Sequence, residues 1–344
     1  MKGRELLNSL CVNLLNPPFS HIYIEKGVVD HPNTVKILSR FPKSTQVIIK
    51  HYKDIFNRSR QNYPVQKQSQ NLIIAEKRPP FVYRGSPLCQ NFGNDNFYYA
   101  NTVINCVYNC EYCYLQGMYP SANIVVFVNL DDIFGDVRKL LKSDPVYLCI
   151  SYDTDLLALE GFLGFSEKWF EFARFYPHLT VELRTKSANL NSLEKLTPQE
   201  NVILAWTLSC EYVWEKYEHG TPSPMQRLNC IEKALAKGFQ IRLCFDPVIY
   251  IKDWEDEYGR LIEKVFRELP AGKIKDVSIG GFRIPCDYLK DMRKNNPNSA
   301  IINYPFNAVN DVYSYPPDLS DRMNSYMLGL IRKYMPEEKI FTWK

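Results

Sequence analysis

The stretch that decides the fold runs from residue 97 to residue 118 and reads FYYANTVINCVYNCEYCYLQGM. Its first part, FYYANTVI (97–104), has the aromatic and β-branched residues of a β-strand. The second part places Cys106, Cys110 and Cys113 in a C-x3-C-x2-C pattern. A disulfide would use two of these thiols, and a structural zinc site takes four ligands, usually as two separate pairs. Three closely spaced thiolates indicate instead a cluster that keeps one coordination site open.

Strand-like and helix-like segments alternate from residue 97 onward. We expect helices at 130–142, 164–176, 224–237 and 254–268, with Gly238 as a helix C-cap. The candidate strands are FYYANTVI (97–104), VYLCIS (146–151), LTVELRT (179–185), VILAWTL (202–208), QIRLCFDPV (240–248) and IKDVSIGGF (274–282). Six strands separated by helices predict a parallel sheet. In a closed or partly closed barrel, functional residues lie after the strands, which is where the cysteine triplet falls.

Composition predicts a cytoplasmic protein. The 344 residues are 45% apolar and carry a net charge of only +4, so nucleic acid binding would require basic residues focused on one face. We find neither a charged segment leading into an apolar run after Met1 nor an apolar stretch long enough to span a membrane, so neither export nor membrane insertion is predicted. Ten cysteines without an export signal favour a reducing compartment, where clustered cysteines bind metals or take part in catalysis.

The cysteine triplet, with Tyr112 before its last member, resembles the motif of the radical SAM superfamily. The resemblance implies one 4Fe–4S cluster held by Cys106, Cys110 and Cys113, and S-adenosylmethionine bound at the open iron site. It also implies radical chemistry supplied by these cofactors. A zinc site with a remote fourth ligand is the alternative interpretation of the same three residues.

Flanking segments resemble the spore photoproduct lyase family more specifically. The matching runs, in order, are HIYIEKG, CEYCYLQ, FVNLDD, YDTDLLALE, RTKSANL, LSCEYVWEKYEHGTPSPMQRL, FDPVIY and YMPEEKIFTWK. The resemblance implies a carbon–carbon lyase that uses a 5′-deoxyadenosyl radical to reverse 5-thyminyl-5,6-dihydrothymine, the spore photoproduct, to two thymines. It also implies a partial (β/α)6 TIM-type barrel over residues 81–344, ending in a DNA-contacting segment and a helix, with residues 1–80 as an N-terminal extension packed on it.

The resemblance also assigns roles to individual residues. Tyr112 corresponds to a residue whose backbone contacts the adenine of the cofactor, and Tyr114 to a tyrosine on the route by which hydrogen returns. Further cofactor contacts are implied after successive strands, at Thr154, Asp155, Lys186, Thr207 and Ser209. Asp155 is equally well placed to cap the next helix.

The hydrogen donor is where the chain departs from the family. Many members have a cysteine at the position of Tyr152, and a phenol is a poorer hydrogen donor than a thiol, although it can join a relay. Strand alternation turns Cys149 toward the helices and leaves Cys244 on the inner face as a second candidate. We prefer Cys89, in the loop SPLCQNFGND (86–95), because an extended chain of that length reaches back along the first strand.

The DNA-binding side is less clearly marked. Family members have a basic, aromatic hairpin near the C-terminus, but the equivalent NYPFNAVNDVYSYPPD (303–318) has neither Lys nor Arg. Arg283 matches an arginine near the lesion. Candidates for stacking on bases are Tyr304, Phe306, Tyr313 and Tyr315, and candidates for phosphate contacts are Arg58, Arg60, Lys67, Lys77, Arg78 and Arg84.

Three interpretations therefore remain: a lyase acting on lesion-containing DNA, a related radical SAM enzyme with another substrate, and an iron–sulfur or zinc protein for electron transfer or structure. For the lyase, the implied partners are the damaged DNA and an electron donor of the flavodoxin or ferredoxin type, and no membrane.

Overall fold

The protein was analysed as a computed structural model that describes residues 19–343. Within this range the larger sheet has eight strands, in the spatial order β18 (Ile340–Thr342), β14 (Ile274–Gly281), β13 (Gln240–Val248), β11 (Val202–Thr207), β10 (Leu179–Thr185), β9 (Val146–Cys149), β5 (Phe97–Ala100) and β4 (Val82–Arg84). All neighbours pair in parallel except β4, which runs antiparallel to β5. The six predicted strands are thus present, adjacent and in chain order.

The first predicted strand is shorter than expected. β5 ends at Ala100, and β6 (Val103–Ile104) belongs to a second sheet, so the prediction of one strand over 97–104 is wrong. The break lies at two buried polar residues: Asn101 donates to Asp153 Oδ2 at 2.5 Å, and the carbonyl of Thr102 accepts from the Phe127 amide at 2.9 Å. These bonds pass the chain from one sheet to the other just before the cysteine triplet.

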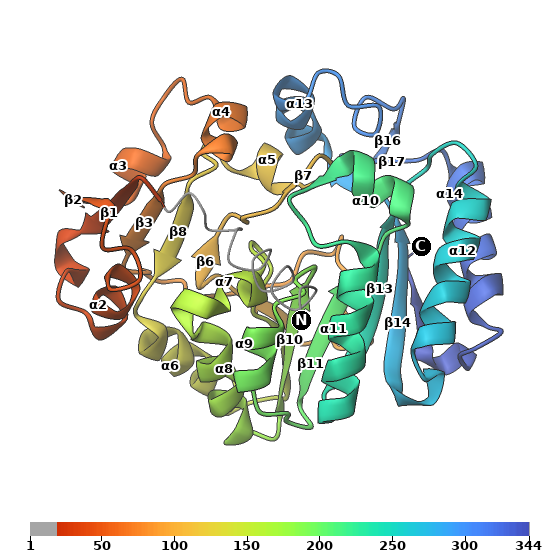
Figure 1. Ribbon diagram of the computed structural model, residues 1–344, viewed down its shortest axis with the longest axis horizontal. Helices are drawn as coiled ribbons and strands as arrows, with labels where there is room; N and C mark the ends of the chain where they lie inside the picture. Colours follow the sequence, from red (N-terminus) through yellow and green to blue (C-terminus); the bar gives the residue numbers. More distant parts are fainter. Residues whose placement is uncertain (1–18, 344) are drawn as a thin grey trace, which may run out of the picture.

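Helices cover the outer face of the larger sheet (Figure 1). They are α6 (Leu130–Leu140), α7 (Leu156–Leu163), α8 (Phe165–Arg174), α9 (Leu190–Lys195), α10 (Glu211–Tyr217), α11 (Pro224–Lys237), α12 (Trp254–Glu268) and α14 (Pro317–Ile331). The best-defined boundaries are those of α11. Ser223 and Gln226 form a capping box at its start, and Gly238 ends it in the left-handed region at φ 95°, as predicted.

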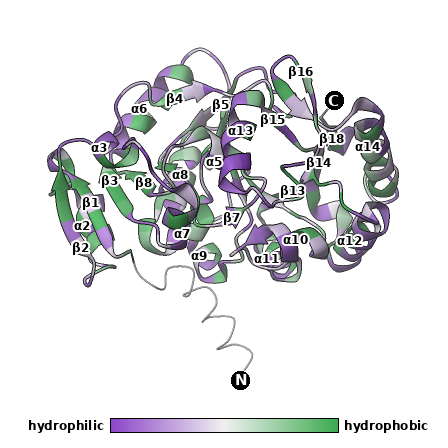
Figure 2. Ribbon diagram, turned by 90° about the horizontal axis from the view of Figure 1, so that it is seen from above, coloured by the Kyte–Doolittle hydropathy of each residue, from purple (hydrophilic) through white to green (hydrophobic). Residues whose placement is uncertain are grey.

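The second sheet has five strands within the described residues. Their order is β2 (Thr45–Ile49), β1 (His21–Glu25), β3 (Leu72–Ala75), β8 (Ile124–Phe127) and β6. Its short helices are α2 (Pro32–Leu38), α3 (Lys53–Phe56) and α4 (Tyr63–Gln68). Hydrophobic residues dominate β1, β3 and β8, as Figure 2 shows. Because β6 and β8 follow residue 80, this N-terminal sheet shares strands with the part of the chain assigned to the barrel.

Smaller elements surround the end of the larger sheet where the parallel strands finish. Strand β7 (Asn109–Cys110) lies in the segment that carries Cys106, Cys110 and Cys113, and it pairs antiparallel with β12 (Glu218–His219). This cysteine segment continues into α5 (Leu115–Met118). A three-stranded sheet follows, in the order β15 (Arg283–Pro285), β17 (Val312–Ser314) and β16 (Asn307–Val309), next to α13 (Cys286–Asn295). Among residues 19–343 we find no helix long and apolar enough to cross a lipid bilayer.

Candidate active site

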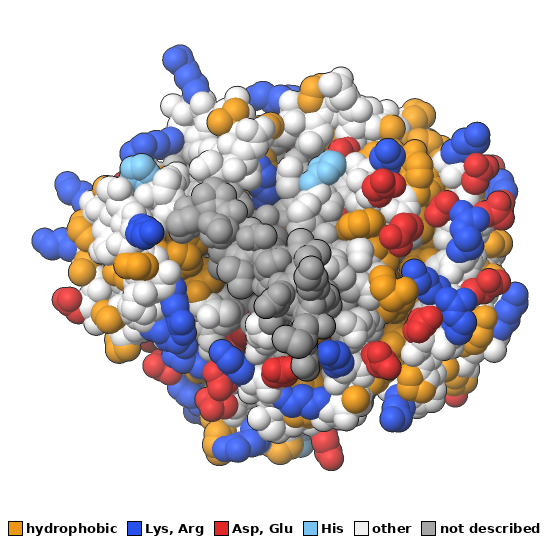
Figure 3. Space-filling model, viewed as in Figure 1, with side chains coloured by type: hydrophobic (Ala, Val, Ile, Leu, Met, Phe, Trp, Pro, Cys, Tyr) orange, Lys and Arg blue, Asp and Glu red, His pale blue; other side chains and the backbone are white. Residues whose placement is uncertain are grey.

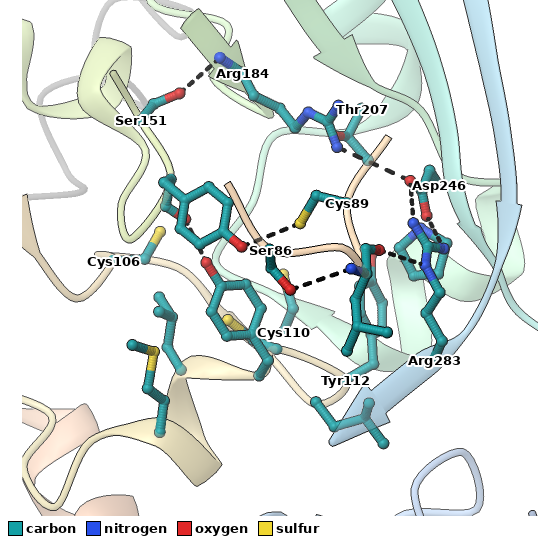
Figure 4. Close-up of a pocket in the computed structure, with 18 of the residues that line it drawn as sticks. Ser86, Cys89, Cys106, Cys110, Tyr112, Ser151, Arg184, Thr207, Asp246 and Arg283 are labelled. Carbon is teal, nitrogen blue, oxygen red and sulfur yellow. Dashed lines mark hydrogen bonds and ion pairs between the residues drawn. The ribbon is translucent and has the colours of Figure 1, made fainter. Parts of the chain in front are cut away.

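A cavity of about 450 Å³ opens at the carboxyl ends of the parallel strands. It is lined by residues from β5, β10, β11, β13 and β14, by the loop that follows β9, and by the cysteine segment. Every predicted site residue except Ser209 lines it: Cys89, Cys106, Cys110, Tyr112, Cys113, Tyr114, Tyr152, Thr154, Asp155, Lys186, Thr207 and Arg283. Residues separated by almost 200 positions therefore meet on one surface, and Figure 4 shows several of them around the cavity.

The cysteine segment is held from both sheets. The backbone carbonyl of Asn105 accepts a hydrogen bond from Thr154 Oγ1 at 2.8 Å. The side-chain amide of Asn105 donates to the backbone carbonyls of Ser121 and Asn123. Glu218 pairs with Cys110 through β12 and β7. Burial raises the pKa of the Cys106 thiol to about 12 and that of Cys110 to about 11. The thiols are therefore protonated at neutral pH until a metal displaces their protons.

A buried charged group lies beneath Cys110. Lys186 Nζ is 3.4 Å from Cys110 Sγ, 2.6 Å from the hydroxyl of Tyr112 and 3.1 Å from Glu218 Oε1. Glu218 also pairs with the fully buried Arg227. Burial alone would raise the pKa of Glu218, but Arg227 and Lys186 outweigh it and hold that pKa well below its usual range. The lysine therefore faces the thiols as an ammonium whose charge Glu218 balances.

Asp155 performs the capping role that its position also predicted. Its Oδ1 accepts from the Ala158 amide at 3.1 Å at the start of α7 and from Thr185 Oγ1 at 2.7 Å. Oδ2 accepts from the Lys186 amide at 2.7 Å. The carboxylate thus fixes the end of β10 and the backbone of Lys186 while it lines the cavity.

Cys89 and Tyr152 are in direct contact. The thiol lies 3.1 Å from the Tyr152 hydroxyl, as Figure 4 shows. The hydroxyl of Tyr114 donates to the carbonyl of Tyr152 and lies 3.2 Å from Asp153 Oδ1. The ring of Tyr99 stacks on that of Tyr152, with centroids 4.2 Å apart. Burial raises the pKa of the Cys89 thiol, so the thiol keeps its hydrogen at neutral pH.

The other cysteines on neighbouring strands do not line the cavity. Cys244 is on the inner face, as predicted, but it is completely buried. Cys149 also lies on this inner face, next to the side chains of Glu182 and Arg184, so the prediction that it points toward the helices is wrong. The reason is that β9 ends at Cys149, and Tyr152 lies beyond it in a turn where strand alternation no longer applies.

Arg283 ties the loop of Cys89 to the sheet. Its Nε donates to the carbonyl of Leu88 at 2.8 Å, and its two terminal nitrogens pair with Asp246 at 3.0 and 3.2 Å. Arg184 lies 4.0 Å from the same carboxylate. Sequence reasoning missed Arg184 and the binding role of Asp246. Their positions at strand ends, facing the same side as predicted site residues, are the signal that could have found them.

Several other predicted residues have different surroundings from those expected. Ser209 lies behind the cavity and accepts from Arg227 Nη1 at 3.5 Å, whereas Thr207 lines it. Phe306 and Tyr315 are buried and pack on each other with centroids 5.2 Å apart, so the expectation that they stack on bases is wrong for this structure. Tyr304 packs on both, and Tyr313 is half-buried.

Of the basic residues predicted to contact phosphate, some are exposed and others are turned toward the protein. Arg58, Arg60, Arg78 and Arg84 are exposed, and Arg84 lines the cavity. Lys77 is half-buried, with its ammonium 5.0 Å from the ring centres of both Tyr83 and Phe127. The prediction that Lys67 contacts phosphate is wrong for this structure, because its ammonium donates to the carbonyl of Cys106.

The donor set fits an iron–sulfur cluster. Thiolates are the ligands that such clusters take, and all three lie on one cavity. No three His, Cys, Asp or Glu side chains within residues 19–343 come together around a single metal ion. A cluster whose thiolates bind separate irons does not require such a grouping.

Comparisons with known proteins identify one family. The spore photoproduct lyase family model matches residues 18–294. The spore photoproduct lyase of Clostridium acetobutylicum is 24% identical over 257 residues, which are 73% of this chain and 75% of that protein. The one from a Geobacillus species is also 24% identical, over 50% of this chain, and the match spans only about half (52%) of that relative.

Solved structures show the same fold. A spore photoproduct lyase complexed with dinucleoside spore photoproduct has a TM-score of 0.80 at 18% identity, covering 94% of this chain and 98% of that one. A mutant with bound AdoMet and dinucleoside spore photoproduct has a TM-score of 0.78, with 94% and 97% covered at 18% identity. Because the family model alone matches well over half of its residues, the chain belongs to the spore photoproduct lyase family.

Proposed function

We propose that this protein is a radical SAM lyase that reverses the spore photoproduct in DNA to two thymines. The observation that carries the proposal is the shared cavity. It joins three thiols suited to a cluster on one side with a protonated thiol, Cys89, on the other, and a tyrosine lies in contact with that thiol. Family membership and a related structure solved with bound AdoMet and dinucleoside spore photoproduct support the same chemistry.

The cofactors would occupy the side of the cavity nearest α5. Cys106, Cys110 and Cys113 would hold one 4Fe–4S cluster, and S-adenosylmethionine would bind beside it. Together these groups would supply a radical able to take a hydrogen atom from C6 of the lesion. The polar groups facing this space are Tyr112, Thr154, Asp155, Lys186 and Thr207, which would hold the cofactor's amino, carboxylate and ribose groups. Ser209 would act from behind, through Arg227.

Cys89 would return hydrogen after the bond between the thymines breaks. The radical left on a thymine takes a hydrogen atom from the Cys89 thiol, which leaves a sulfur radical. Tyr152 is 3.1 Å from that sulfur and would give it a hydrogen atom in turn. The ring of Tyr114 packs edge-on to that of Tyr152, with centroids 6.2 Å apart, and would continue the return route. Arg283 and Asp246 would keep the Cys89 loop in place.

DNA would approach across the N-terminal sheet. A cavity of about 450 Å³ is too small for a duplex, so the lesion would have to leave the helix. Exposed basic residues on and beside the N-terminal sheet outnumber exposed acidic ones, and Figure 3 shows many of them at its edge. They are Lys26, Lys36, Arg40, Lys43, Lys50, Lys53, Arg58, Arg60, Arg78 and Arg84, against Asp30, Asp54 and Glu76. Such a surface would bind phosphates without reading sequence.

The remaining assignments follow from this function. We propose that the six parallel strands from β5 to β14 form a partial (β/α)6 barrel, with residues 1–80 as an extension whose strands continue into β8 and β6. Its residues 1–18 lie outside the described range. The three clustered cysteines would bind a cluster rather than form disulfides, which supports a reducing compartment such as the cytoplasm. A small flavodoxin or ferredoxin would supply electrons.

One observation favours a related radical SAM enzyme with another substrate. The β16–β17 hairpin has neither Lys nor Arg, and the aromatics beside it, Phe306 and Tyr315, are buried. A hairpin of this kind presents little to a DNA phosphate backbone.

A single assay separates the candidates. Protein reconstituted anaerobically with iron and sulfide is mixed with dithionite, S-adenosylmethionine and the dinucleotide spore photoproduct, and the products are separated by chromatography. We expect the thymine dinucleotide to be restored. Cleavage of S-adenosylmethionine with the lesion untouched would show another substrate. Absence of cleavage in a protein that holds its iron would show a protein for electron transfer or structure.

A further inference from the structure

A second lysine, from a helix beside the N-terminal sheet, also contacts the cysteine segment. Lys67 lies in α4, and its Nζ donates to the carbonyl of Cys106. Tyr63, one helical turn earlier on α4, is buried near the same thiols. Helix α4 therefore contacts the cysteine segment from outside the set of residues that line the cavity. It accompanies the N-terminal sheet, whereas Lys186 follows β10 of the larger sheet.

The charge of Lys67 has no carboxylate to balance it. Among residues 19–343, no ion pair involves this lysine, whereas Lys186 pairs with Glu218. The side chain of Lys67 is half-buried, and its ammonium donates to the backbone carbonyl of Cys106. A half-buried cation without a counterion carries part of the cost of desolvation, so the site is suited to an anion.

Holding the loop does not by itself require Lys67. Gln70 Nε2 donates to the same carbonyl of Cys106 at 3.1 Å and to that of Ala122 at 2.6 Å. Gln66 Oε1 accepts from the Ala122 amide at 2.9 Å. The segment would remain hydrogen-bonded to this region without the lysine, so the particular contribution of Lys67 is its positive charge.

We propose that the positive charge of Lys67 raises the reduction potential of the cluster bound by Cys106, Cys110 and Cys113. This inference rests on the proposed function. A cluster with three thiolate ligands gains one negative charge when it accepts an electron, and a nearby ammonium in a site of low polarity stabilises the more negative state. The N-terminal sheet would thereby make the cluster easier to reduce.

The test compares reduction potentials rather than activity. Wild type, K67M, K67R and K139M are reconstituted anaerobically, and the reduced cluster is followed by electron paramagnetic resonance as dithionite lowers the potential. Lys139 is the matched control, because its side chain is 75% exposed and a charge lost there is screened by solvent. Iron content is measured on each sample first.

We expect K67M to lower the ratio of reduced to oxidised cluster at a fixed potential by roughly tenfold, which corresponds to about 59 mV for a one-electron couple. K67R and K139M should stay close to wild type. If K67M does not take up iron, K67Q, which can still donate to the Cys106 carbonyl, is titrated instead. A full cluster with an unchanged potential in the neutral variant would overturn the inference. Failure of wild type to bind a cluster would overturn the proposed function with it.

Discussion

Two groups of polar and charged side chains lie on the inner face of the larger sheet. They differ in how completely their ion pairs and hydrogen bonds to other side chains are formed. In the first, Arg242 donates to Asp276 through Nε and Nη2 and to Glu182 through Nη1, and its guanidinium lies 3.2 Å from the ring centre of Phe92. Tyr147 donates to Glu182 as well. All these side chains are buried or nearly so, and none of them lines the cavity.

The second group surrounds the cavity and is less completely satisfied. Lys186 faces the thiol of Cys110 as well as its partner Glu218, and the thiol of Cys89 lies against the phenol of Tyr152. A buried charge that is fully paired contributes to holding strands together, whereas one that faces an open space is available to a ligand. The comparison indicates that the Arg242 group is structural and that the cavity group carries the chemistry.

The largest effect should follow from changes to the cysteine triplet. Replacing Cys106, Cys110 or Cys113 by Ala should abolish both iron binding and lesion repair, because a cluster with one open iron needs all three thiolates. Iron content and visible absorbance after reconstitution measure this. Cys286→Ala is the control, since that thiol lies outside the cavity and its variant should keep its iron. A triple variant that retained full iron would refute the ligand assignment.

A change in the paired group should affect stability instead. Arg242→Met leaves Asp276 buried without its ion-pair partner and Glu182 paired with Arg184 alone, which costs about 3–5 kcal/mol of unfolding free energy. The measurement is urea unfolding of the metal-free protein. Arg322→Met is the matched control, because Arg322 and Glu255 form an exposed pair worth at most about 1 kcal/mol. If both variants unfolded alike, the Arg242 group would not be the structural element that its pairing suggests.

The sequence predicted the residues that line the cavity better than it predicted the buried residues on the neighbouring strands. The order of the six strands and the place of the triplet followed from alternation and spacing, since each strand end brings its next residues to one edge. The side of Cys149 was wrong because its strand ends sooner than predicted. Arg242 and Glu182 are 60 residues apart in the chain, and no local pattern shows that their strands bring them together.

The role of Lys67 was also beyond the reach of sequence reasoning. In the tract NRSRQNYPVQKQSQ it looks like any other exposed basic residue. Only the folded chain shows that α4 turns it toward the cysteine segment rather than toward solvent.

The measurement that tests the account most directly is the product distribution of Cys89→Ala with the dinucleotide lesion and dithionite. The variant should bind its cluster and cleave S-adenosylmethionine nearly as well as wild type, because those steps precede the return of hydrogen. The thymine radical would then lack its donor, so adducts with dithionite-derived reductant should accumulate at the expense of repaired thymines, whereas Cys244→Ala should repair cleanly. Normal thymines from Cys89→Ala at the wild-type rate, with no adduct, would contradict the assignment and make Cys244 the candidate.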